Sequence, residues 1–521
     1  MLKRHILWYV AVLFISNLTF AQEAEKIDLQ MIQKIKQEAF NNSKIMESIF
    51  YLADLNGPRL TGSPNFRAAA EWAKKQLIEW GMQNVTLEEW GTFGRGWTME
   101  KVSLEMTEPQ YMPVIAYAKA WTAGTNGVIS GSPLLLDVKT EDDLEKYKDS
   151  LSNRIVMLGK PREYKMRFED EAERLSEEDL ADLAKAPEPG EKPEWWGERD
   201  KWLQFRRLSR KANEMAKKAG AALILQGSER QHGTVRLTDS GSHDLNGETG
   251  LPALVVATEH YGRIYRLLEK KIKVNLRAEV QARFYDQDSV GFNVIAEIPG
   301  TDKKLKKEVV MLGAHLDSWH AGTGVADDGG CCAIMMEAVR ILKALNVKPK
   351  RTIRLALWAG EEQGFLGSRG YVARHFGDRK TMTLKPEHAD FSVYFNLDNG
   401  VGKIRGIYLQ GNDAARPVFE SWFKPFNDMG AATITIRNTG GTDHIPFNEI
   451  GLPGFQFVQD DLDYMPRAHH TNMDVYERVV PADVMDSAVI LASFVYNAAM
   501  RDEKIPRKEL PKPDSNVGND D

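Results

Sequence analysis

Cysteine is nearly absent from this chain of 521 residues, which contains only Cys331 and Cys332, next to each other. Two adjacent cysteines cannot join distant segments, so the fold does not depend on a disulfide framework of the kind found in small secreted domains. Both fall at the start of an apolar helical pattern that continues to Leu345. That setting favours two buried small side chains over a redox role or a metal-binding role.

An excess of positive charge is also missing. The chain has 68 Lys and Arg against 74 Asp and Glu, a net charge of −6, and no basic cluster. It therefore offers no argument for nucleic acid as a partner. A hydrophobic content of 42% with 27% charged residues is ordinary for a globular protein. The length predicts about two to four domains.

The long apolar run of the chain lies at its start. Ile6 to Phe20 follows Lys3 and Arg4 and is followed by Ala21, which predicts a secretory signal peptide at 1–21, cleaved near Ala21. The alternative is an uncleaved membrane anchor, but the run is shorter than the roughly 20 residues needed to span a bilayer. We therefore expect a secreted or periplasmic protein with no stable membrane insertion after cleavage.

Apolar patterns predict an α/β fold with a mixed, largely parallel sheet flanked by helices, formed by 22–115 and by a core at 286–500. The N-terminal part shows helical patterns at 45–55 and 67–80. Between the two parts, 116–285 contains short apolar strands separated by glycine and polar turns, which predicts a β-rich insert. The tail at 501–521 has no apolar periodicity and is predicted to be disordered.

The insert contains a charged stretch at 162–218, rich in Glu, Lys and Arg, with Trp195 and Trp196 in its middle. Charge runs of this type are typical of solvated helices. The paired tryptophans favour an alternative, a lid or a homodimer contact, because exposed aromatic side chains are enriched at interfaces.

Acidic residues and histidines follow apolar runs at separate places in the core. Ligands far apart in sequence meet where the strands of a parallel sheet end, at its carboxyl edge. Four carboxylates brought together there could not all stay ionised without a compensating cation. Histidines mixed with carboxylates indicate a transition metal, and the charges balance for two Zn²⁺ per chain. The residues concerned are His315, Asp317, Asp327, Glu361, Glu362, Asp398 and His470.

The motifs in this region resemble those of the dizinc exopeptidase family of bacterial leucyl aminopeptidases and glutamate carboxypeptidases, and within it the carboxypeptidase Q group. The resemblance rests on ordered strings: His315-Leu-Asp-Ser-Trp, Asp327-Asp-Gly-Gly, Glu361-Glu-Gln-Gly, Gly-Gly-Thr-Asp443 and His470-Thr-Asn-Met-Asp. It covers nearly the whole mature chain. It implies a zinc exopeptidase core, with the β-rich insert as a protease-associated domain.

The resemblance also implies a role for each residue. Asp327 bridges two zinc ions, His315 and Asp398 complete one site, and Glu362 and His470 complete the other. Glu361 is the general base. The residue Asp317 is expected to orient the imidazole of His315 and to fix its tautomer. For Asp443 and His469, substrate contact and an ordinary loop position remain open alternatives.

We therefore expect a zinc metallopeptidase that removes terminal residues from short peptides or dipeptides. The acidic residues Asp460, Asp461 and Asp463 favour a free amine at the substrate terminus, as in an aminopeptidase or dipeptidase. The alternative is a metallocarboxypeptidase, which needs a cation for the terminal carboxylate, and Arg437 favours it. A glutaminyl cyclase and a non-catalytic binding protein on the same scaffold are further alternatives.

Overall fold

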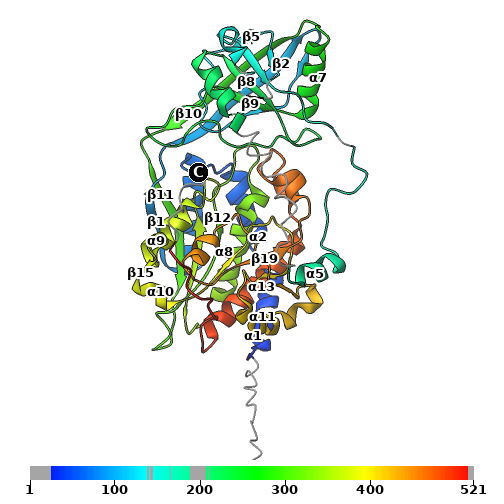
Figure 1. The fold of residues 1–521 in the computed structure, drawn as a ribbon. Coiled ribbons are helices and arrows are strands. Elements are labelled where there is room, and N and C mark those ends of the chain that lie inside the picture. Colours follow the sequence, from blue (N-terminus) through cyan, green and yellow to red (C-terminus); the bar gives the residue numbers. More distant parts are fainter. Residues whose placement is uncertain are drawn as a thin grey trace, which may run out of the picture.

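In a computed structural model, the described part of the chain is residues 25–513, without 138–139, 141–142, 144, 165, 188–206 and 209. The predicted signal peptide at 1–21 and the pair Trp195 and Trp196 lie outside these residues. The molecule has two regions (Figure 1). The lower region is built on an eight-stranded sheet with helices around it, and the upper region on a four-stranded and a five-stranded sheet.

The eight-stranded sheet has its parallel strands at the centre. Its order is β1-β11-β13-β12-β16-β19-β17-β18, and β13, β12, β16 and β19 run parallel to one another. All residues of β12, β16 and β19 are buried, as expected for strands covered on both faces. The predicted mixed, largely parallel α/β fold is confirmed. The strands are β1 (Gln83–Thr92), β11 (Val290–Ile298), β12 (Val309–His315), β13 (Thr352–Trp358), β16 (Phe391–Asn396), β17 (Ile404–Tyr408), β18 (Thr433–Thr435) and β19 (Gly454–Gln459).

Helices cover both faces of this sheet. One face shares a large apolar core with α1 (Leu29–Asn42), α2 (Ile45–Ile49), α3 (Pro64–Glu79), α8 (Gly330–Ala344), α11 (Arg416–Phe423) and α13 (Pro481–Met500). The other face carries an aromatic cluster with α9 (Leu366–His375) and α12 (Ile445–Glu449). Cys331 and Cys332 on α8 are free and fully buried, as predicted. Among the described residues, no helix is long and apolar enough to cross a membrane.

The upper region contains two sheets that share one apolar core. The four-stranded sheet has the order β3-β2-β10-β5, and the five-stranded sheet β4-β9-β8-β7-β6. β2 pairs along its length with β10, although it precedes residue 116, where we placed the start of the insert. The elements are β2 (Gly96–Glu108), β3 (Met112–Pro113), β4 (Ala116–Ala118), β5 (Ile129–Gly131), β6 (Leu134–Leu136), β7 (Ile155–Leu158), β8 (Leu223–Gly227), β9 (Ala253–Val256), α7 (Thr258–Glu269) and β10 (Asn275–Tyr285).

One segment of the charged stretch leaves the upper region and lies against the lower one (Figure 1). We call residues 171–185 the strap; it includes α5 (Glu177–Ala184). Arg174 donates to Asp460 and Asp483 at 2.8 Å each. Arg405 donates to the carbonyl of Leu175 at 2.9 Å and to Asp460 at 2.8 Å. The charged side chains of α5 are exposed, as its charge pattern predicted, and the segment just before the helix is fixed to the core by the ion pairs of Arg174.

The described part of the C-terminal tail is packed and not disordered. Ile505 is buried, and Arg507 donates to the carbonyls of His388 and Phe391. Lys508 donates to the carbonyl of Gln410 at 2.5 Å. The expectation of disorder for 501–521 is therefore wrong for 501–513, because single side chains anchor a segment that has no periodic apolar pattern. Residues 514–521 lie outside the described part.

Removing the carboxylate of Asp460 should destabilise the protein strongly. Asp460 is fully buried and accepts from Arg174, Arg405 and the backbone N–H of Leu175. Asp460→Ala removes the buried carboxylate that pairs with Arg405, so we expect a loss of about 3–5 kcal/mol in the free energy of unfolding, measured in urea. The control Asp413→Ala removes an exposed carboxylate paired with Arg416 and should cost about 0–1 kcal/mol. Equal losses would contradict the role of the strap contact.

Candidate metal centre

Five predicted ligands meet at the carboxyl edge of the parallel strands. His315 is the last residue of β12, Glu362 follows β13, and Asp398 follows β16. Asp327 lies in a π-helical turn, Val325–Gly329, just before α8, and His470 lies in the loop after β19. Because these strands run parallel, their ends deliver the side chains to one place although they are far apart in sequence.

His315 forms one group with two carboxylates. Its Nε2 lies 3.2 Å from Oδ1 of Asp327 and 3.6 Å from Oδ1 of Asp398. The possible ligand atoms of these three residues all lie within 4.8 Å of one another. The three side chains are almost completely buried. One metal ion could accept all three ligands.

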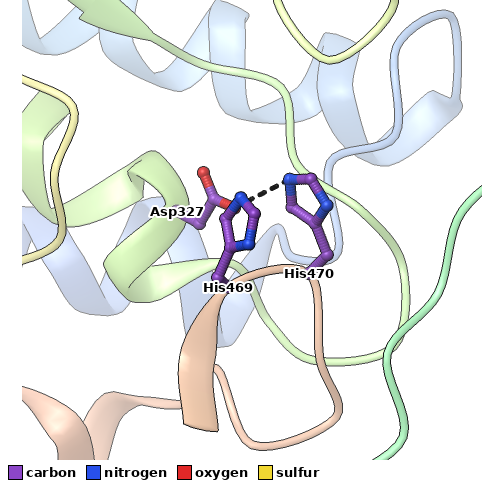
Figure 2. Close-up of side chains that lie close together, drawn as sticks. All are labelled: Asp327, His469 and His470. Carbon is purple, nitrogen blue, oxygen red and sulfur yellow. Dashed lines mark ion pairs between the residues drawn. The ribbon is translucent and has the colours of Figure 1, made fainter. Parts of the chain in front are cut away.

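His470 forms a second group on the other side of Asp327. Its Nε2 lies 3.4 Å from Oδ2 of Asp327 and 2.9 Å from Oε2 of Glu362. Figure 2 shows the Asp327 carboxylate next to the rings of His469 and His470, with the contact to His470 dashed. Asp327 therefore turns one oxygen to each histidine, which is the arrangement of a carboxylate that bridges two metal ions.

Unpartnered oxygens indicate that this cluster fits cations. Among the described residues, Oδ2 of Asp327 and Oε1 of Glu362 are buried without a hydrogen-bond partner. A buried acceptor without a partner is costly, and a buried carboxylate is more so. Imidazole nitrogens and carboxylate oxygens are normal zinc ligands. The donor set and its unfilled acceptors thus fit zinc.

The protonation of the cluster reflects its excess of negative charge. Burial raises the pKa of Glu362 well above its usual range, and Asp327 adds to this effect. Burial, with Asp398 and Asp443 nearby, also raises the pKa of Glu361. Burial lowers the pKa of His470 to about 4, so its ring is neutral and can act as a ligand. A bound cation would favour the ionised carboxylates and so reverse their shifts.

Asp317 contacts Nδ1 of His315, as expected for a residue that orients this ring. Its backbone carbonyl lies 3.0 Å from Nδ1, and its carboxylate oxygen Oδ1 lies 3.7 Å from the same atom. The carboxylate accepts from Thr61 at 2.9 Å and from the backbone N–H groups of Glu361 and Glu362 at 3.3 Å each. Asp317 therefore positions the His315 ring and the two-glutamate turn at once.

Two further residues fix the loop that carries Asp327. Asp474 accepts from the backbone N–H groups of Ala326 at 2.6 Å and Asp327 at 3.1 Å. Arg59 is fully buried and donates to the carbonyls of Leu316 and Gly324 at 2.6 Å each. Sequence reasoning missed Arg59, which lies more than 250 positions before the loop and carries no motif.

Asp443 and His469 both lie near the centre, but in different settings. Asp443 has no exposed surface and accepts a hydrogen bond from Ser368. Its burial raises its pKa to about 8. His469 stacks on His470 with ring centroids 3.8 Å apart, and its possible ligand atom groups with those of Asp327 and His470. Asp443 is thus enclosed, whereas His469 is a further candidate ligand, a role that we had not assigned to it from the sequence.

Two arginines of the upper region reach the centre, and sequence reasoning missed both. Arg236 Nη2 lies 3.4 Å from Nδ1 of His470. The charge of Arg230 acts, with that of Arg236, on the neighbouring His469. The Nε atoms of both arginines are buried without a partner among the described residues. The link is made by backbone contacts, such as the N–H of Leu237 donating to the carbonyl of His470 at 2.9 Å.

Comparisons with known proteins agree with this geometry. The family model described as Peptidase family M28 matches residues 293–495, which contain all five ligands. Carboxypeptidase Q of Mus musculus is 27% identical over 463 residues, covering 88% of this chain and 87% of that protein. Aminopeptidase YwaD of Bacillus subtilis is 28% identical over 204 residues, covering 38% of this chain and 42% of that protein.

A solved structure supports the fold over nearly the whole length. A peptidase M28 precursor from Shewanella amazonensis SB2B aligns with a TM-score of 0.66 at 23% identity, covering 93% of this chain and 98% of that chain. With the ligand cluster and the matched family model, the resemblance seen in the motifs is confirmed. Residues 293–495 match Peptidase family M28, and the chain is a metallopeptidase that resembles the zinc exopeptidases.

Proposed function

We propose that this protein is a dizinc exopeptidase that hydrolyses the terminal bond of short peptides or dipeptides. The observation that carries the proposal is the position of Asp327, whose two oxygens face His315 and His470 in two adjacent ligand groups. His315 and Asp398 would hold one zinc, and Glu362 and His470 the other. A secreted or periplasmic location and a possible homodimer belong to the same proposal and rest on the sequence alone.

The residues divide the chemistry between binding and proton transfer. Zinc bound at this centre supplies a Lewis acid that polarises a carbonyl and lowers the pKa of a water molecule. Glu361, next to the proposed ligand Glu362 and only 8% exposed, would take a proton from the attacking water and pass it to the leaving amine. The hydrogen bond from its backbone N–H to Asp317 fixes the turn that carries it.

Most of the charged residues that the sequence suggested for binding the substrate terminus form ion pairs within the protein. Asp460 is paired with Arg174 and Arg405, and Asp463 with Arg478. Neither carboxylate is therefore available to a substrate amine. Arg437, the cue for a carboxypeptidase, is paired with Asp182 of the strap at 3.2 Å.

Arg236 and Arg230 favour recognition of a substrate carboxylate. They lie beside His469 and His470 and keep N–H groups without a partner among the described residues. Arginine binds carboxylates through its planar fork of donors, often with two hydrogen bonds. The resemblance to carboxypeptidase Q supports the same direction. We therefore propose a carboxypeptidase or dipeptidase, with an aminopeptidase as the alternative. A glutaminyl cyclase with one zinc and a non-catalytic binding protein are disfavoured, because all five ligands and Glu361 are present.

Metal analysis tests the dizinc centre. We expect about two zinc ions per chain, and a lower melting temperature after chelation that Zn²⁺ restores, because the ions bind the folded state. The melting temperature gives a readout that is independent of activity. One ion or none in active protein would reject the dizinc proposal, and one ion would favour the cyclase.

Substitution of the two neighbouring glutamates tests whether Glu361 is the general base and Glu362 a metal ligand. Glu361→Gln should keep both ions while kcat falls by about 10²–10⁴, since only proton transfer is lost. The matched variant Glu362→Gln should lose zinc affinity as well. Metal content and kcat measured on both variants decide the roles. Near wild-type turnover in Glu361→Gln would show that another group is the base.

Blocked peptides test which terminus is bound. A C-terminal amide should lower kcat/KM by about a hundredfold or more, because it removes the negative charge that Arg236 and Arg230 would bind, whereas N-acetylation should have a small effect. Arg236→Ala should reduce the penalty for the amide, with metal content measured in parallel. Arg283→Ala, on the exposed side of β10, is the control. A large penalty for acetylation and none for the amide would identify an aminopeptidase.

A further inference from the structure

A cavity of about 630 Å³ lies between the strap and the lower region. The strap forms one wall through α5, and the end of β19 forms part of the other. Two lining residues connect the cavity to the metal centre. Asn399 follows the ligand Asp398 in the chain, and the ring of Tyr464 lies 5.3 Å from that of His469. A peptide held at the centre therefore has this cavity beside it.

The cavity is strongly acidic. Glu178, Asp179 and Asp182 line it from the strap and Asp461 from the lower region, against the single cation Lys185. Asp182 is paired with Lys185 and Arg437, and Asp179 bonds to Ser176 at the start of α5. Among the described residues, neither Glu178 nor Asp461 has an ion-pair partner. The cavity thus has two carboxylates left for a ligand.

A buried amide gives an independent indication of a hydrogen-bond donor in the ligand. Gln459 lines the cavity and is only 6% exposed. Its Nε2 donates to the carbonyls of Gly400 at 2.7 Å and Gly402 at 3.3 Å, which fixes the orientation of the amide. Its Oε1 has no partner among the described residues. A buried acceptor without a partner is costly, and a hydrogen-bond donor in a bound ligand would satisfy it.

The remaining walls are apolar. Leu175 and Leu183 come from the strap, and Tyr408, Val458 and Met465 from the lower region. Lysine and arginine side chains match such a cavity, because their aliphatic stem packs on apolar surface while their charged head reaches polar partners. A short α-ammonium group would satisfy the carboxylates but would leave the apolar walls without a contact.

We propose that this cavity binds the side chain of a lysine or arginine in the substrate, with Glu178 and Asp461 facing its charge and Gln459 accepting from it. The inference rests on the proposed exopeptidase function and adds the class of substrate. It makes the strap a determinant of specificity, since α5 brings Glu178 to the cavity.

Charged and uncharged dipeptides of similar shape test the proposal. Lys-Ala is compared with norleucyl-Ala, and Ala-Lys with Ala-norleucine, by kcat/KM on the zinc-loaded full chain. We expect the lysine peptide to be preferred about tenfold or more at one of the two positions, the value of about one well-placed ion pair. Equal rates within both pairs would overturn the proposal but not the exopeptidase function. No hydrolysis of any of the four peptides would reject the function itself.

Charge removal in the cavity completes the test. In the double variant Glu178→Gln with Asp461→Asn, the ratio of the lysine to the norleucine rate should fall toward one. Glu177→Gln is the matched control, because Glu177 is a neighbour on α5 that does not line the cavity, and it should keep the ratio. An unchanged ratio in the double variant would overturn the proposal. Equal losses for both peptides would overturn it too, because the carboxylates would then bind the α-amine that both share.

Discussion

Buried negative charge is the constraint on which this structure depends. Asp327, Glu362 and Asp398 converge in a site from which water is largely excluded, and Glu361 lies beside them. In a low dielectric such carboxylates repel one another and lose hydration, so each must take up a proton or meet a cation. The histidines supply only part of the charge. The burial of His315 is outweighed by the carboxylates around it, which raise the pKa of its ring, but burial keeps the ring of His470 neutral. The centre is therefore complete only with metal ions, and the fold around it has to keep the ligands in place.

The same constraint explains the polar residues around the centre. Asp317 and Asp474 accept backbone N–H groups of the loops that carry the ligands, so these loops cannot turn the ligands away. Farther away, Asp460 is as buried as the ligands but is satisfied by Arg174 and Arg405. A fixed arginine partner removes a carboxylate from ligand binding. The carboxylates without an arginine partner can bind metal ions, whereas Asp460 only holds the strap.

Sequence reasoning succeeded where the relevant information is local. Each ligand follows an apolar strand directly or by one loop, so His315, Glu362 and Asp398 could be placed at one sheet edge from the pattern alone. Sequence reasoning failed for pairs of residues or strands that are far apart in sequence and are brought together only by the tertiary fold. The pairing of Asp460 with Arg174 spans 286 positions, and no local signal indicated it. The pairing of β2 with β10, which brought β2 into the upper region, is non-local in the same way.

The failure has a common physical origin at Arg59, Arg236 and the strap. Their side chains act through single contacts to distant backbone or carboxylate groups, and such contacts leave no periodicity in the sequence. A charge run in the sequence indicates only that a segment can be solvated. Whether a helix such as α5 is free or docked depends on the charges it meets, here Arg405 and Arg437.

In the proposed function, chemistry and recognition belong to different parts of the chain. The lower region supplies every candidate ligand and Glu361, whereas Arg236 and α5 come from the insert and approach the centre by different routes. Two regions that share one site must be held in register. The short contacts from Leu237 to His470 and from Val235 to Asn472 do this on one side, and Arg174 does it on the other. Because one of these contacts ends on His470, a candidate ligand, changes in the insert can affect the metal centre as well as what is bound.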